Sequence, residues 1–152
     1  MSRDVATNKK ARRDYHISET FEAGIELRGT EVKSIREGKV NVSEAFARVD
    51  KEQVFLYGCD IQPWQTAAEY FQHAPRRPRR LLLHKREILK LAQMTEQKGY
   101  SLPCLRIYFK GRRVKVEIGL GKGKSHSDQR HDLKKRVEMR EAEREVARHH
   151  RR

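Results

Sequence analysis

The order of apolar and polar residues along the chain predicts several short strands and few helices. Ile25 and Leu27 alternate with polar neighbours before a turn at Gly29, and similar alternation recurs later in the chain. Spacing between these stretches is short and turn-like, which is typical of an antiparallel sheet with one solvated face. The predicted strands are 15–27, 43–49, 54–61, 105–109 and 114–120.

Two helices are predicted between the strands. Residues 30–37 fit a short helix with Thr30 as N-cap and Gly38 as its stop. Residues 86–98 carry an apolar stripe at helical spacing and end before Gly99. Short helices among many strands favour a small, partly open barrel, of which the oligonucleotide-binding type is one solution among several small α+β folds.

The segments outside these elements divide the chain into three parts. Residues 1–13 are basic and lack an apolar period, so they predict an arm, with ordered structure beginning near Tyr15. Residues 14–121 hold the predicted sheet, with 62–80 as a proline-containing excursion from it. Residues 122–152 have few large apolar residues but a helix-favouring composition, which predicts a basic tail that is disordered when free and helical when bound.

Composition narrows the class of partner. The chain has 152 residues, with 35 Lys and Arg against 21 Asp and Glu, and a formal net charge of +14. Nucleic acid is the simplest partner for such an excess, because binding releases counterions from the polyanion. Absence of a long apolar run predicts a soluble, cytoplasmic protein that does not bind a membrane. Cys59 and Cys104 are far apart in the sequence, and each lies in an apolar run. We therefore predict that both are core residues of a protein in a reducing compartment.

Motifs for catalysis and metal binding are weak. The segment 119–125 ends in Gly-Lys-Ser, as a phosphate-binding loop does, but Ile118 stands where that motif needs its first glycine. A flexible hinge carrying lysines explains the segment better. The histidines form no cluster of three or four ligands, so we predict no metal, no cofactor and no catalytic residue.

Basic residues gather in three places: the N-terminal arm, the run 76–86, and the tail. The middle run contains no acid, and arginine suits phosphate because its planar fork donates two hydrogen bonds. A merely solvated charged loop is the alternative. In the tail, arginine recurs at every fourth position from Arg136 to Arg152, which on a helix makes one ridge suited to a polyanionic wall. Glutamates at 141, 143 and 145 leave open a self-paired charged helix.

The order of several short motifs resembles the small protein B family of bacterial proteins that bind transfer-messenger RNA (tmRNA). The motifs are Asn8-Lys9-Lys10-Ala11-Arg12, Glu19-Thr20-Phe21-Glu22-Ala23-Gly24-Ile25, Gly29-Thr30-Glu31-Val32-Lys33-Ser34, Val54-Phe55-Leu56-Tyr57, Arg80-Leu81-Leu82-Leu83-His84-Lys85-Arg86-Glu87-Ile88 and Tyr108-Phe109-Lys110. The resemblance implies a mainly β fold: an oligonucleotide-binding-like barrel of six antiparallel strands with three helices. It also implies trans-translation, with an adaptor that is not an enzyme.

The resemblance implies partners and site residues as well. The body would hold the elbow and D-loop of the tRNA-like domain of tmRNA, and the tail would enter the decoding centre and mRNA channel of a stalled small subunit. Elongation factor Tu and alanyl-tRNA synthetase would be partners indirectly, through tmRNA. Expected tmRNA-binding residues are Asn8, Lys9, Arg12, Glu22, Lys33, Arg36, Arg76, Arg77, Arg79, Arg80, Leu82, Lys85 and Arg86. Expected ribosome-binding residues of the tail are Lys122, Lys124, His126, Asp128, Arg130, Lys134, Lys135, Arg136, Arg140 and Arg144.

The sequence departs from the family pattern mainly in the tail. Ser125, Ser127 and Gln129 replace residues that the family usually has there, and Ala74 replaces an aspartate often found before Pro75. Core packing is the alternative role for Leu82, and satisfaction of loop amides is the alternative for Glu22. Two rival functions fit the composition: a ribosomal or rRNA-scaffolding protein, and an RNA-modifying or nucleotide-hydrolysing enzyme.

Overall fold

A computed structural model of the chain describes residues 2–64 and 72–124, together with six single positions in the tail. Its strands are β1 (Ser2–Thr7), β2 (Tyr15–Ile25), β3 (Val40–Asn41), β4 (Phe46–Asp50), β5 (Gln53–Tyr57), β6 (Asp60–Ile61), β7 (Arg79–Leu82), β8 (Tyr100–Lys110) and β9 (Arg113–Gly123). Its helices in these two ranges are α1 (Lys9–Asp14), α2 (Gly29–Arg36) and α3 (Lys85–Thr95).

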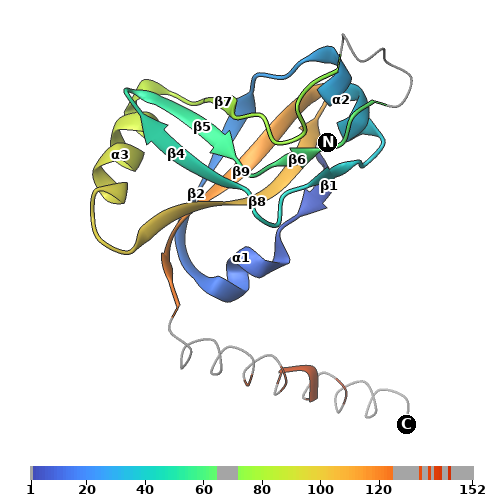
Figure 1. The fold of residues 1–152 in the computed structure, drawn as a ribbon. Coiled ribbons are helices and arrows are strands. Elements are labelled where there is room, and N and C mark those ends of the chain that lie inside the picture. The colour runs from blue at the N-terminus through green and yellow to red at the C-terminus, as the bar shows by residue number, and fades with distance from the viewer. Residues whose placement is uncertain are drawn as a thin grey trace.

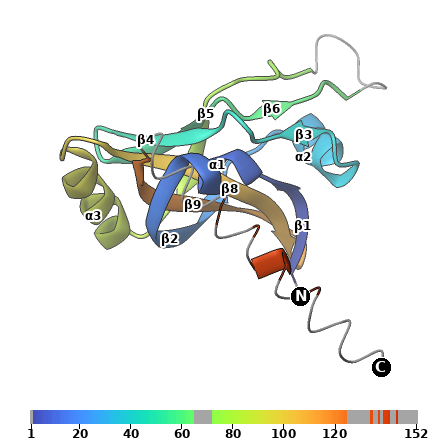
Figure 2. The ribbon, with the colours of Figure 1, turned by 90° about the horizontal axis from the view of Figure 1, so that it is seen from below.

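Six of the strands form a closed ring in which all pairings are antiparallel. The order is β8, β4, β5, β7, β2 and β9, and β9 pairs back with β8. β1 is added outside the ring against β8, and β3 and β6 form a separate pair. α3 and β1 lie at opposite ends of the molecule in both views (Figure 1, Figure 2). The expected mainly β, antiparallel class with six ring strands is confirmed.

The core fills the ring, and alternation along each strand places it there. Val54 and Leu56 of β5 and Val116 and Ile118 of β9 are fully buried, while residues between them reach the outside. Cys104 also lies in this core, and both cysteines are free and buried, as predicted. Burial raises the pKa of the Cys59 thiol to about 11, so this thiol is protonated and unreactive.

The predicted hairpin of 43–49 and 54–61 is present as β4 and β5, with Asp50 paired to Gln53, but β4 begins only at Phe46 and β5 ends at Tyr57. Lys51 and Glu52 form its turn, both with positive φ, which is typical of the type I′ turns that match strand twist. Both predicted helices are present, although the second ends at Thr95 rather than Lys98. The final strands are longer than predicted, because β8 and β9 pair from Tyr100 and Lys122 to the turn.

Two details of the prediction are wrong. Ordered structure begins before Tyr15: β1 pairs with β8 through backbone groups, a pairing that needs no apolar period, and α1 follows it. Thr30 is not the N-cap of α2, because the helix begins at Gly29 and the Glu31 carboxylate accepts the Arg28 N–H at 2.8 Å. Among the described residues, no helix is long and apolar enough to cross a membrane.

Candidate nucleic-acid interface

Cross-strand register brings one row of residues to the outside of the ring. Leu82 of β7 pairs with Gly24 of β2, Gly24 pairs with Lys115 of β9, and Lys115 pairs with Tyr108 of β8. Residues paired in this way point to the same side of a sheet. The next row, which includes Ala23 and Val116, is fully buried, so the Leu82 row faces outward. We call this outer surface of β7, β2, β9 and β8 the outer face.

Glu22 lies on the outer face and is held by two donors. The Tyr108 hydroxyl donates to Oε2, and Lys110 Nζ donates to Oε1 at 3.2 Å. The Tyr108 hydrogen bond lowers the pKa of Glu22, burial opposes this, and the Lys110 ammonium adds to the lowering. The carboxylate is therefore ionised and fixed in direction, although it is 39% exposed. It can accept hydrogen bonds from base amino groups or ribose hydroxyls.

The half of the outer face toward β1 is covered by charges that pair with each other. Arg106 Nη1 lies 2.5 Å from Asp4 Oδ1, its Nε lies 3.0 Å from Glu117 Oε2, and its guanidinium is 4.0 Å from the centre of the Tyr108 ring. Arg12 of α1 reaches Glu117 at 3.7 Å. Arg12, one of the residues expected to bind RNA, therefore stands at the border of this face with its side chain 62% exposed.

Leu82 and Arg80 form the opposite border, on β7. Leu82 is 47% exposed, and its side chain lies over Gly24, where an added Cβ would come within 3.3 Å of the Leu82 Cβ. A core-packing role for Leu82 is wrong, because β7 points this residue outward while Leu81 enters the core. Arg80 Nη1 contacts Glu26 at 3.1 Å and remains exposed.

Lys85 and Arg86 lie in the first turn of α3, which two residues separate from the end of β7. Both are exposed, and neither forms an ion pair with any described residue. In sequence, these two cations continue the series of exposed residues that begins with Arg80 and Leu82. Lys33 and Arg36 are also exposed and without an ion pair within the described ranges, but they lie on α2, away from the residue rows that build the outer face.

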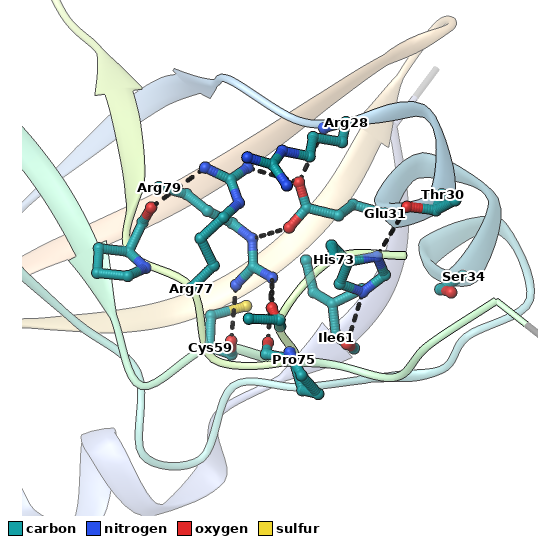
Figure 3. Close-up of polar contacts among 12 residues, drawn as sticks. Arg28, Thr30, Glu31, Ser34, Cys59, Ile61, His73, Pro75, Arg77 and Arg79 are labelled. Carbon is teal, nitrogen blue, oxygen red and sulfur yellow. Dashed lines mark hydrogen bonds and ion pairs between the residues drawn. The ribbon is translucent and has the colours of Figure 1, made fainter. Parts of the chain in front are cut away.

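The arginine run 76–80 does not act as one patch, because Glu31 of α2 draws two of its members inward (Figure 3). Arg79 is fully buried and its Nε donates to Glu31, while its other nitrogens donate to the carbonyls of Cys59 at 2.8 Å and Pro75 at 3.0 Å. Arg77 Nη2 lies 2.6 Å from Glu31 Oε1. A role for Arg79 as a phosphate contact is corrected: this guanidinium neutralises a buried carboxylate.

The Glu31 carboxylate remains ionised in this cluster. Burial alone would raise its pKa, but hydrogen bonds from Arg77, the Arg28 amide and Arg79 outweigh burial and lower it. The same helix holds the returning chain at a second point, where His73 Nδ1 lies 2.8 Å from Thr30 Oγ1 and its Nε2 donates to the Ile61 carbonyl at 2.9 Å (Figure 3). Arg76, by contrast, is 62% exposed and 3.6 Å from Asp60.

Asn8 is buried rather than exposed for RNA. Its side-chain amide donates to the carbonyls of Val42 at 3.0 Å and Cys104 at 2.8 Å, and its Oδ1 accepts the Ala11 N–H as N-cap of α1. The Asn8 side chain therefore ties α1 to the ring, and the expected part of Asn8 in tmRNA binding stays a prediction. Lys9, the next residue, is exposed.

The structure describes part of the expected tail site. Lys122 lies 5.2 Å from the centre of the Tyr100 ring, and Lys124 donates from its backbone N–H to the Asp14 carbonyl at 2.8 Å. Lys134, Arg140 and Arg144 are helical and exposed. The remaining expected tail residues lie outside the described residues; they are His126, Asp128, Arg130, Lys135 and Arg136. The Gly119–Gly123 segment belongs to strand β9 and is not a phosphate-binding loop.

One basic group on this surface was missed at the level of sequence. Lys110, Arg112, Arg113 and Lys115 surround the β8–β9 turn, beside Glu22 and Gly24. The available signal was the absence of any acid between positions 110 and 116. The sequence indicates only a short turn between two strands. The strand register shows that this turn adjoins the outer face.

Comparisons with known proteins agree with the residue-level resemblance. The family model described as SmpB protein matches residues 5–148. An SsrA-binding protein of Chloroflexus aurantiacus is 50% identical over 144 residues, covering 95% of this chain and 90% of that protein. An SsrA-binding protein of Geobacillus thermodenitrificans is 50% identical over 140 residues, covering 92% and 90%.

A solved structure described as "tmRNA-SmpB: a journey to the center of the bacterial ribosome" contains a similar chain. It is 44% identical, with a TM-score of 0.66, and the match covers 84% of this chain and 92% of that one. Sequence identity of about half over nearly the full length of the relatives shows common family membership, and not only a shared fold. The chain therefore belongs to the SmpB family.

Proposed function

We propose that this protein binds tmRNA through its outer face and acts in trans-translation on stalled ribosomes. Relatives at about half identity are SsrA-binding proteins, and the similar solved chain is described together with tmRNA and the ribosome. Members of such a family act by binding RNA, without a covalent step. The six-stranded ring serves as an oligonucleotide-binding-like barrel, whose surface is a known platform for nucleic acid.

The observation that carries the proposal is the composition of the outer face. Leu82 exposes an apolar side chain, and the Glu22 carboxylate on the same face is a hydrogen-bond acceptor held in one direction. Arg80 is an exposed cation on the same strand as Leu82. Lys85 and Arg86 extend the charge. An apolar contact and a directed acceptor flanked by phosphate-seeking cations suit a folded RNA whose loop nucleotides are unstacked, such as the D-loop and elbow of a tRNA-like domain.

The tail would serve the ribosome-facing step. Lys124 is anchored to the end of α1, so the basic segment after it leaves the body from a defined point. Entry of this segment into the decoding centre and mRNA channel would signal an empty site without codon pairing. Elongation factor Tu and alanyl-tRNA synthetase would then meet the protein only through the bound tmRNA.

A paired charge-removal experiment tests the outer face. Lys85→Gln/Arg86→Gln removes two exposed cations that follow Leu82 closely in sequence, and Arg48→Gln/Lys98→Gln removes two exposed cations from other parts of the chain. Arg48 lies on β4, three strands from β2 in either direction around the ring. The first variant should weaken binding to the tRNA-like domain and lower the salt-dependence slope by about 1.4–1.8, at about 0.7–0.9 per lost phosphate contact. Equal effects of both variants would contradict the proposed face.

Removal of residues 131–152 tests the division of labour. Binding to the tRNA-like RNA should remain nearly unchanged, whereas tagging of stalled peptides should be abolished. Equal loss of both activities would refute separate roles for body and tail. Recovery with ribosomes in high salt, at full stoichiometry and without tmRNA, would instead support an rRNA-scaffolding protein.

A further inference from the structure

The β8–β9 turn and the strand residues beside it carry four cations. Lys110, Arg112, Arg113 and Lys115 fall within six residues, and only Lys110 pairs with a described acid, Glu22 at 3.2 Å. The three others have no ion pair within 2–64 and 72–124. Arg112 and Arg113 are exposed. Four like charges this close repel each other, so an anionic partner would stabilise them. We call these four residues the hairpin cations.

The turn presents these cations on a rigid support. Lys110 pairs with Arg113, which leaves Gly111 and Arg112 as a two-residue turn, and Gly111 has the positive φ of 63° that such a turn needs. On the inner side, Phe109 and Val114 are buried and fix the two strands. Little conformational entropy of the backbone would therefore be lost on binding, in contrast to a flexible basic loop.

The register places the hairpin cations directly beside the proposed interface. Lys115 pairs with Gly24, and Gly24 pairs on its other side with Leu82. Two strand spacings, about 10 Å, thus separate the backbone of Lys115 from that of Leu82. Because Gly24 has no side chain, nothing on β2 rises between them at this level. Cations therefore flank Leu82 from two sides: Arg80 on β7 and the hairpin cations on the β8–β9 hairpin.

We propose that the hairpin cations form a second phosphate-binding site, which holds the backbone of the same RNA on the side of Gly24 opposite to Arg80. This inference rests on the proposed function, because it assigns the site to the RNA that the outer face binds. A nucleotide contacting Leu82 would then be held between two backbone contacts. The second site would therefore fix the direction in which the RNA crosses the sheet, and it would also increase the affinity for the RNA.

The test compares three two-charge variants on two RNAs. Arg112→Gln/Arg113→Gln removes half of the hairpin cations without breaking any ion pair among the described residues; Lys85→Gln/Arg86→Gln and Arg48→Gln/Lys98→Gln serve for comparison. Binding to the tRNA-like domain of tmRNA and to an unstructured strand of equal length is measured over a salt series. Thermal unfolding checks that each variant keeps the wild-type melting temperature.

The hairpin variant should lower the salt-dependence slope for the tRNA-like RNA by about 1.4–1.8, with a smaller change for the unstructured strand. A wild-type slope for this variant, beside a reduced slope for Lys85→Gln/Arg86→Gln, would overturn the second site and leave the proposed function intact. An equal reduction on both RNAs would also overturn it, since the cations would then bind any polyanion. Failure of the wild-type protein to prefer the tRNA-like RNA would overturn the proposed function itself, and the site with it.

Discussion

The Glu31→Gln variant tests whether the buried carboxylate is what keeps Arg79 stable inside the ring. Glutamine has nearly the same shape and still offers one oxygen to the Arg28 amide, but it carries no charge. The Arg79 guanidinium would remain fully buried, with neutral acceptors such as the carbonyls of Cys59, Ala74 and Pro75 in place of a carboxylate. A variant that removes charge while preserving volume isolates the electrostatic part of the interaction.

The expected cost is about 3–5 kcal/mol, because removing one partner of a buried ion pair leaves an uncompensated charge in a medium of low polarity. The weakened Arg77 contact adds to this cost, since that side chain is mostly buried and its hydrogen bond contributes to lowering the Glu31 pKa. A domain of this size has a total stability of about 5–15 kcal/mol, so a large share of it would be lost. The Arg79→Gln variant should cost a similar amount.

Urea unfolding followed by circular dichroism measures both single variants and the double variant. The double variant should cost less than the sum of the singles, by up to about 3 kcal/mol, because neither charge is then buried alone. The pH dependence gives an independent check. Glu31 has a folded-state pKa below its ordinary value of 4.5, so its contribution is present above pH 4.5 and is lost as the pH falls below it. Glu31→Gln should flatten this acid limb. A single-variant cost below about 1 kcal/mol, with an unchanged acid limb, would refute the reasoning.

Three further predictions concern single side chains. Asn8→Ala should destabilise the protein by about 2–4 kcal/mol in urea unfolding, because it removes the α1 cap and two buried hydrogen bonds, to the carbonyls of Val42 and Cys104; a cost near zero would contradict the anchoring role. Tyr108→Phe should raise the pKa of Glu22 toward 4.5 in a carbon-detected NMR titration, because the strongest donor to that carboxylate is lost; an unchanged pKa would show that Lys110 alone holds it. Leu82→Ala should leave the melting temperature nearly unchanged yet weaken binding to the tRNA-like RNA severalfold, and loss of stability instead would mean that Leu82 supports the core.

Local features of the fold could be predicted because they depend on neighbours in sequence. The alternation around Ile25, the turn at 50–53 and the apolar stripe of 86–98 each define an element through its own periodicity or turn residues. The start of ordered structure could not be found in this way. β1 is held by backbone pairing with β8, about a hundred residues away, and such pairing leaves no mark in the side-chain pattern.

The candidate site was recovered unevenly for the same reason. Glu22, Arg80 and Leu82 came from short motifs, and the register then brought them onto one face. Arg79 and Arg80 are adjacent arginines that the sequence cannot tell apart, yet one is buried and the other exposed, because successive residues of a strand point to opposite sides. Which of the two enters the ring depends on Glu31, which lies 48 residues earlier in the chain.

By itself, the sequence determined the class of the protein: a basic, mainly β chain of a recognisable RNA-binding family, with the charge needed to hold a polyanion. These properties are sums over residues or patterns between near neighbours. Only the tertiary structure decided which charges are available to RNA. A cation is available only if its charged group reaches the surface, and this depends on contacts between distant segments, as in the burial of Arg79 against Glu31 and the placement of Lys115 beside Gly24.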